Sequence, residues 1–261
     1  MIENASPHRT GNLPAPPPAP HRNWALFLDV DGTLLDIAAH PSAVTVPPGL
    51  REHLALLEQV LDGALALVSG RPLDDLDRLF DPLRLPASGQ HGGEWRPQPP
   101  LPREVVARRT IPERLRQAAE SLRDLDPGII VEQKSHALAV HYRHAPSLGP
   151  DIGARLEHAL YGIEGLILLP GKLVWEVKDA AQSKGTAVER FMAEPRFAGR
   201  IPVFIGDDTT DVDGFRAVEA MGGMALPVGA LIQPGRPGFT DAAAVRAWLA
   251  EFASSAAGAD R

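Results

Sequence analysis

The chain of 261 residues contains no cysteine. Disulfide bonds, thiolate metal sites and cysteine nucleophiles are therefore excluded. The sequence also lacks an apolar run of the roughly 18 residues that a membrane-spanning helix needs, so we expect no membrane partner. A basic segment followed by an apolar stretch is missing from its start. We therefore expect no secretory signal and a cytoplasmic location.

The chain also has fewer basic than acidic residues. Lysine and arginine total 26 against 33 acidic residues, which gives a net charge of -7. A nucleic-acid-binding surface usually carries a concentrated basic patch, so we expect no nucleic-acid partner, and we interpret the arginines within 103–109 as a solvated face. The phosphate loop of P-loop nucleotide enzymes, GxxxxGK[ST], is missing too. We expect a monomer whose partner is a small molecule.

Proline is abundant at one place, the segment LPAPPPAP at 13–20. Such a segment has few backbone donors and cannot bury much apolar surface, so residues 1–21 are predicted to form a disordered or extended tail. The small and polar residues 254–261 are predicted to fray after the last helix.

Between the tails, apolar runs alternate with amphipathic segments in two blocks. Strands are predicted at 24–29, 64–68, 201–205 and 223–228, and helices at 49–61, 72–80, 185–192, 209–219 and 241–252. This alternation predicts an α/β fold whose parallel sheet is covered on both faces. The predicted core comprises residues 22–103 and 179–253.

The middle of the chain has a different order of elements. A helix at 111–125 precedes paired strands at 129–134 and 138–143, and a helix at 148–161 precedes a second pair at 166–169 and 173–177. The order helix, hairpin, helix, hairpin predicts a separate α+β domain. We place it at 104–178, inserted into the α/β domain.

The apolar run 24–28 is followed at once by DVDGTL at 29–34. Two aspartates at the mouth of a buried strand are unusual, because like charge and desolvation raise the pKa of at least one such carboxylate. The arrangement suits chemistry that needs one carboxylate as nucleophile or ligand and a second as proton carrier.

Polar groups follow other predicted strands as well. The tripeptide SGR at 69–71 combines a hydroxyl, a glycine amide and a guanidinium, which can cradle an anion but is also common in turns. The segment GDDTTD at 206–211 carries three carboxylates, which suit Mg²⁺. Helix capping is the alternative, although a cap needs only one such side chain. Lys184, at the start of a predicted helix, offers a point charge for a phosphoryl group.

Together these groups supply what phosphoryl transfer needs: a nucleophile, a cation site and a proton donor. Their order and wording resemble the haloacid dehalogenase (HAD) phosphatase superfamily over about 24–95 and 179–250. The resemblance implies a doubly wound parallel-sheet core with an inserted cap. It also implies that Asp29 attacks phosphorus and that Asp31 is the general acid and base.

The same resemblance implies the remaining core roles. The phosphoryl group would be held by Ser69, Gly70 and Lys184. Mg²⁺ would be bound by Asp29, the carbonyl of Asp31 and Asp207, and its site would be positioned by Asp208 and Asp211.

Four further segments are similar to trehalose-6-phosphate phosphatases: GQHGGE at 89–94, VEQK at 131–134, HYR at 141–143 and GKLVWEV at 171–177. This similarity implies that the inserted domain is a cap that closes over the core and grips a disaccharide. The implied substrate contacts are Arg71, Glu132, Lys134, Arg143, Lys172 and Glu176. His91 and Glu94 are expected to shape the seam between core and cap.

The residues alone leave several cap roles open. Glu132 and Lys134 share one face of a strand, where they can meet sugar hydroxyls or form an exposed cross-strand ion pair. His141 is either structural or catalytic, and Trp175 either packs in the cap or stacks on a sugar.

Two positions depart from the family pattern: Ser183 stands where Asn is frequent, and Val212 where Glu is common. We expect altered rates from them rather than lost activity. The sequence thus predicts a Mg²⁺-dependent phosphatase that converts trehalose 6-phosphate to trehalose, the last step of trehalose biosynthesis, through a phosphorylated Asp29. Alternatives are a phosphatase for another sugar phosphate, of the sucrose phosphate or mannosyl phosphoglycerate type, and a non-catalytic sugar-phosphate sensor, which would not need both aspartates.

Overall fold

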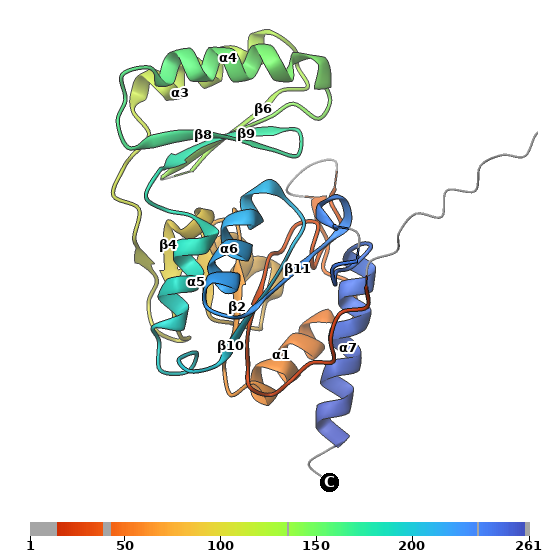
Figure 1. The fold of residues 1–261 in the computed structure, drawn as a ribbon. Helices are drawn as coiled ribbons and strands as arrows, with labels where there is room; N and C mark the ends of the chain where they lie inside the picture. The colour runs from red at the N-terminus through yellow and green to blue at the C-terminus, as the bar shows by residue number, and fades with distance from the viewer. Residues whose placement is uncertain (1–14, 39–42, 135, 234, 259–261) are drawn as a thin grey trace, which may run out of the picture.

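The computed structural model describes residues 15–38, 43–134, 136–233 and 235–258 (Figure 1). The expectations for 1–14 and 259–261 concern residues outside these ranges. Two sheets organise the described chain, one of seven strands and one of four. The predicted α/β class with a mostly parallel central sheet is confirmed. No helix within the described ranges is both long and apolar enough to cross a bilayer.

The large sheet has the strand order β11-β10-β1-β2-β3-β4-β5. Its strands are β1 (Trp24–Leu28), β2 (Leu65–Val68), β3 (Ala87–Gly89), β4 (Glu94–Arg96), β5 (Glu104–Val105), β10 (Ile201–Gly206) and β11 (Met224–Pro227). The first five in the spatial order run parallel, while β4 and β5 are antiparallel additions at one edge. The sequence did not predict β3, β4 and β5, because strands of two or three residues are too short to show an apolar pattern.

Helices cover both faces of the large sheet. On one side α1 (Leu50–Val60) packs against α7 (Ala242–Gly258), and on the other α5 (Lys184–Met192) packs against α6 (Val212–Ala220) (Figure 1). The helix α2 (Leu73–Phe80) connects β2 to β3. All five residues of β1 are buried, as expected for a central strand covered by helices on both faces.

The chain leaves β1 towards β2 but leaves β10 towards β11, on the opposite side. The adjacent strands β1 and β10 therefore flank the point where the strand order reverses. In open α/β sheets, ligands bind in the crevice at the carboxyl ends of the strands at this point. Leu28 pairs with Ile205, so the residues that follow both strands emerge side by side.

The small sheet is antiparallel, with the order β6-β7-β9-β8. Its elements are β6 (Ile130–Gln133), β7 (Ala137–His141), β8 (Leu166–Gly171), β9 (Val174–Asp179), and the helices α3 (Glu113–Ser121) and α4 (Gly149–Leu160). The helices cover the face of the small sheet that is turned away from the large sheet (Figure 1). Helices and small sheet share an apolar cluster that is separate from the core of the large sheet. The other face is turned towards the large sheet.

The side chain of Trp175 lies on the face of the small sheet that α4 covers. Its Nε1 donates to the carbonyl of Gly149 at 2.8 Å, and its ring packs against Gly153 of α4. The packing interpretation of this tryptophan therefore holds in the structure.

The chain ends differ from expectation. The helix α7 continues to Gly258, so the expected fraying of residues 254–258 is wrong. Alanine favours helix, Ala253 is buried, and the Ser254 hydroxyl donates to the Ala250 carbonyl at 2.8 Å. At the other end, the amide of Ala15 donates to the carbonyl of Arg236 at 3.1 Å. The start of the described chain is therefore held in place by this backbone contact.

The chain passes from the large sheet to the small one near residues 108–109 and returns near residues 179–181, and one carboxylate connects these two segments. Asp179, at the end of β9, accepts the amides of Arg108 and Arg109 at 2.9 and 3.1 Å and the amide of Ala181 at 2.9 Å. Its side chain is buried. Burial alone would raise the pKa of Asp179, but the three amides outweigh it and lower the pKa.

Replacement of Asp179 by alanine leaves these amides without their acceptor. We expect Asp179→Ala to lower the free energy of unfolding by about 2–4 kcal/mol, since a hydrogen bond to a charged acceptor contributes about 1.5–3 kcal/mol and three part-buried ones are lost together. Urea denaturation measures the change. Asp126→Ala is the matched control, because that half-buried carboxylate accepts only the amide of Gly128. Equal losses in the two variants would contradict a special role of Asp179 at the crossings.

Candidate active site

Asp29 lies at the carboxyl end of β1, inside the crevice. Its amide donates to the carbonyl of Ile205 at 3.0 Å, which holds the backbone against β10. The side chain is 6% exposed, and its Oδ1 lies 2.8 Å from the Nζ of Lys184 at the start of α5. The predicted nucleophile and the predicted phosphate-binding lysine are therefore in contact.

The turn after Asp29 packs directly on Asp207. Gly32 has a φ of +87°, and a Cβ at this position would overlap the Asp207 carboxylate. Glycine is thus required both for the backbone angle and for the close approach. Next to it, the buried Thr33 hydroxyl donates to Asp207 Oδ1 at 3.1 Å. Sequence patterns did not point to this contact of Thr33, because its partner lies far along the chain.

Three carboxylates converge at this point. One oxygen from each of Asp29, Asp207 and Asp211 lies within 4.8 Å of the others. Lys184 Nζ is the neighbouring cation, 2.6 Å from Asp211 Oδ1. Oxygen donors in excess of positive charge suit a hard divalent cation such as Mg²⁺.

The pKa values reflect this crowding. Burial raises the pKa of Asp29 well above its ordinary value, and the charge of Asp211 adds to this increase. Burial and the Asp211 charge also raise the pKa of Asp207, to about 6. Burial alone would lower the pKa of Lys184, but the neighbouring Asp211 and Asp29 outweigh it and raise the pKa. Lys184 therefore stays charged.

The segment after β10 both caps a helix and contributes carboxylates to the cluster. Asp208 caps the 3-10 turn Thr209–Asp211 through a 2.7 Å bond from the amide of Thr209. Asp211 is fully buried, and its Oδ2 accepts the amides of Asp207 and Asp208 at 3.0 and 2.9 Å. The segment thus serves both predicted purposes: Asp208 caps the turn, and other aspartates join the carboxylate cluster. Asp211 contributes an oxygen to this carboxylate cluster, whereas the family resemblance implied only that it positions the metal site.

Asp31 lies apart from the carboxylate cluster and faces Arg71. The Nε and Nη2 atoms of Arg71 donate to the two oxygens of Asp31 at 2.5 and 2.6 Å. The sequence assigned Arg71 to the substrate, whereas in the structure its guanidinium orients the predicted general acid. A bidentate pair of this kind fixes the plane of the carboxylate.

The tripeptide after β2 borders the crevice. Ser69 is 1% exposed, and its hydroxyl accepts the amide of Arg71 at 3.2 Å. Ser183, where the family often has Asn, caps α5 by accepting the amide of Thr186 at 3.1 Å and so supports the helix start that carries Lys184. Val212 is the first residue of α6 and is half-buried.

The cleft between the two sheets brings most predicted site residues together. From the large sheet it is lined by Asp29, Asp31, Ser69, Gly70, Arg71, Lys184, Asp207 and Asp208. From the small sheet it is lined by Glu132, Lys134, Arg143, Lys172 and Glu176. Glu132 and Lys134 share the face of β6 that is turned to the cleft, as their alternation predicted.

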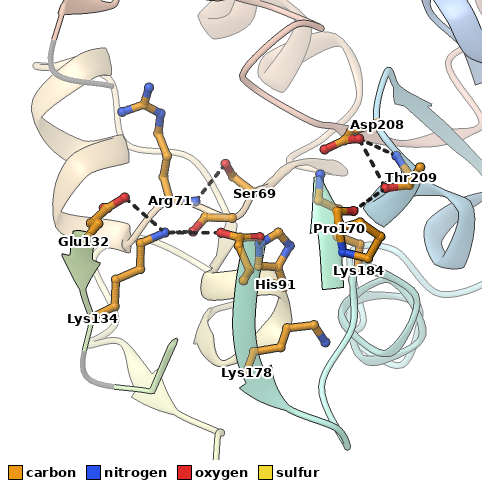
Figure 2. A network of polar contacts seen from close by, with 12 residues as sticks. Ser69, Arg71, His91, Glu132, Lys134, Pro170, Lys178, Lys184, Asp208 and Thr209 are labelled. Atoms are coloured by element: carbon orange, nitrogen blue, oxygen red, sulfur yellow. Dashed lines mark hydrogen bonds and ion pairs between the residues drawn. The ribbon is translucent and has the colours of Figure 1, made fainter. Parts of the chain in front are cut away.

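Lys134 reaches across the cleft. Its Nζ donates to the carbonyl of Gly70 at 3.0 Å and lies 3.8 and 3.7 Å from carboxylate oxygens of Glu132 and Glu176 (Figure 2). The pair is therefore not an exposed cross-strand ion pair. His141 Nε2 lies 3.2 Å from Glu132 Oε2, so this histidine holds a neighbour in the small sheet.

Other contacts close the same seam. Thr209 Oγ1 donates to the carbonyl of Pro170 at the tip of the β8–β9 hairpin, at 2.9 Å (Figure 2). Arg143 donates to the carbonyl of Ala38. Lys172 is exposed at the hairpin tip. The two sheets therefore enclose the cleft from both ends.

Glu94 differs from its expected place at the seam. Its Oε2 accepts the amide of Leu73 at 2.6 Å and its Oε1 accepts Nε2 of Gln90 at 2.7 Å, so it satisfies the start of α2 inside the large domain. Gln90 makes the seam contact instead, because its Oε1 accepts the amide of His136 at 3.3 Å.

Comparisons with known proteins agree on one family. Residues 27–233 match the family model described as trehalose-phosphatase. The chain is 44% identical over 209 residues to a "Probable trehalose-phosphate phosphatase" of Sinorhizobium fredii, covering 79% of this chain and 78% of that protein. It is 39% identical over 206 residues to the "Trehalose-6-phosphate phosphatase" of Escherichia coli, covering 79% and 77%.

A solved structure agrees on the fold. The C-terminal domain of the C. albicans trehalose-6-phosphate phosphatase superposes with a TM-score of 0.77 at 21% identity, covering 91% of this chain and 98% of that one.

The buried Asp211 should be essential for stability. In Asp211→Ala, the buried ammonium of Lys184 loses the nearer of its carboxylate partners, and two half-buried amides lose their acceptor. We expect a loss of about 3–5 kcal/mol in the free energy of unfolding, as for other broken buried ion pairs. Denaturant titration provides the measurement. The exposed Asp213→Ala variant should stay within about 0.5 kcal/mol of the parent protein. A similar small change in Asp211→Ala would refute this account of the cluster.

Proposed function

Because this chain belongs to the trehalose-phosphatase family, we propose that it hydrolyses trehalose 6-phosphate to trehalose and phosphate with the help of Mg²⁺. The observation that carries the proposal is the contact of Asp29 with Lys184 beside the other carboxylates at the point where β1 and β10 meet. A phosphoric monoester hydrolase needs this combination of nucleophile, cation and acid.

In the proposed first step, a carboxylate oxygen of Asp29 attacks phosphorus. The bond between phosphorus and the sugar oxygen breaks, and Asp31 gives its proton to that oxygen, because a sugar alkoxide is a poor leaving group. The product is free trehalose and an aspartyl phosphate on Asp29.

In the second step, water attacks the phosphorus of this intermediate and Asp31 takes up a proton from the water. The bond between phosphorus and the carboxylate oxygen breaks, so phosphate leaves and Asp29 is restored. Arg71 fixes the orientation of the Asp31 carboxylate in the structure, and it must release at least one of the two oxygens before that oxygen carries the proton.

Charge on the phosphoryl group must be neutralised by groups already in place. Lys184 supplies a permanent positive charge next to Asp29, and Ser69 and Gly70 supply the neighbouring loop. The carboxylates of Asp29 and Asp207 and the carbonyl of Asp31 would hold Mg²⁺, and the close approach of Asp211 fits such a site. When bound, the ion supplies further positive charge for the phosphoryl oxygens.

The polar face of the small sheet supports the sugar part of the proposal. Glu132, Lys134 and Glu176 line the cleft above the phosphoryl site and offer both acceptors and donors for hydroxyl groups. A small sheet that only stabilised the fold would not need three charged side chains on the face turned to the cleft.

Phosphate release from trehalose 6-phosphate tests the reaction directly. We expect turnover by the parent protein and none above background by Asp29→Asn, because the amide cannot attack phosphorus. Asp36→Asn is the control, since Asp36 is an exposed aspartate paired with Arg246. Near-normal turnover by Asp29→Asn would contradict the attack of Asp29 on phosphorus. Faster release from sucrose 6-phosphate by the parent protein would overturn the proposed substrate.

Metal dependence has a readout apart from activity. Mg²⁺ should raise the melting temperature by roughly 5 °C at about 100 times its dissociation constant, because it binds the folded state. Asp207→Asn should lose most of this shift, whereas Asp213→Asn should keep it. Turnover should stop with EDTA and return with excess Mg²⁺. A parent protein without any thermal shift would contradict the proposed site.

A further inference from the structure

His91 belongs to the large domain, yet its side chain meets the small sheet. Its Nε2 lies 2.6 Å from Oε2 of Glu176, with side-chain exposures of 6% and 12%. We propose that His91 is a positioning residue that couples closure of the small sheet to the phosphate-binding loop by holding Glu176 over the cleft. The inference deepens the proposed function and rests on it.

The backbone of His91 is tied to the phosphate-binding loop. Its amide donates to the carbonyl of Ser69 at 3.0 Å, and its φ and ψ of 53° and 42° lie in the left-handed region. That conformation is unfavourable for a residue with a Cβ, so the surrounding contacts must maintain it.

The imidazole lies directly beneath Gly70. A Cβ on Gly70 would come within 2.5 Å of His91 Nε2, so the ring occupies the space that a side chain at position 70 would need. Both ring nitrogens are buried, and neither makes a well-aligned hydrogen bond to a described residue, so the 2.6 Å contact of Nε2 with Glu176 is an ion-pair contact. Glu176 is thus the principal polar partner of the ring, and separation of the two sheets would remove it.

Residues of the small sheet also contact the phosphate-binding loop. Glu176 stands on β9, and its Oε1 lies 3.7 Å from the Nζ of Lys134, which donates back to the Gly70 carbonyl at 3.0 Å (Figure 2). Two residues of the small sheet therefore contact the loop, one directly and one through His91. Burial alone would raise the pKa of Glu176, but His91, together with Lys134 and His141, outweighs it and keeps the pKa well below the usual range.

These contacts link two parts of one substrate. The phosphoryl group is proposed to lie against Ser69 and Gly70, and the sugar against Glu176. A carboxylate held by His91 presents its remaining lone pairs to sugar hydroxyls only while the small sheet is closed on a correctly folded loop. Removal of the imidazole should therefore weaken sugar-dependent closure without changing the chemistry at phosphorus.

Kinetics on two substrates separates these effects. Trehalose 6-phosphate uses the small sheet, whereas p-nitrophenyl phosphate offers no sugar. We expect His91→Ala to raise the KM for trehalose 6-phosphate about 10-fold and to leave kcat/KM for p-nitrophenyl phosphate within about twofold. Glu176→Gln should act similarly, and the double variant should be no worse than the poorer single one.

His141→Ala is the matched control. Its ring also contacts a glutamate, Glu132 at 3.2 Å, but both residues belong to the small sheet. Loss of this ring should therefore leave the contact between His91 and Glu176, and with it the separation of the two sheets, unchanged.

A distance measurement tests closure without any substrate. Because the chain has no cysteine, spin labels can be placed at Tyr161→Cys in the small-sheet domain and Ala198→Cys in the large one, both at exposed positions. We expect His91→Ala to lengthen and broaden the distance distribution, and His141→Ala to keep that of the parent protein. This readout is valid even if the proposed sugar is wrong.

Three results would overturn the inference. A parallel loss of p-nitrophenyl phosphate turnover in His91→Ala would mean that the imidazole only supports the loop beneath Gly70. Additive losses in the His91 and Glu176 double variant would mean that the two residues are not coupled. An unchanged distance distribution in a His91→Ala protein of parental melting temperature would mean that closure does not depend on this contact.

Discussion

One buried ammonium group organises the site. Lys184 Nζ lies between Asp29 and Asp211 at 2.8 and 2.6 Å, where neither carboxylate has much contact with water. Without this charge, the carboxylates at the ends of β1 and β10 would repel one another in a medium that screens poorly. The start of α5, the turn after β1 and the turn after β10 are therefore placed by a single electrostatic requirement, and the candidate metal site is a consequence of it.

The seam between the domains follows a different principle. Its polar groups meet across the cleft, Lys134 at the Gly70 carbonyl and His91 at Glu176. Buried polar groups need partners, so these contacts favour the closed arrangement of the two sheets. The cleft is thereby lined by charged acceptors and donors from both sheets.

Much of the fold was predictable because its elements are local. The buried runs at β1, β2 and β10 and the alternating helices indicated a parallel sheet, and the change of pattern after residue 110 indicated a second layer. The short strands β3 to β5 gave no periodic signal, and they form because neighbouring strands offer free backbone groups. The length of α7 was underestimated, because the packing that buries Ala253 is not written in the local sequence.

The sequence by itself determined which chemical groups stand at the strand ends, since DVDGTL, SGR and GDDTTD are each contiguous with an apolar run. Only the tertiary structure decided which side chain each of these groups contacts. Arg71 faces Asp31 across 40 residues, Asp211 joins Lys184 across 27, and His91 meets Glu176 from another domain. Such pairs depend on sheet order, turn geometry and closure of the seam, and these arise from packing of the whole chain rather than from any local pattern.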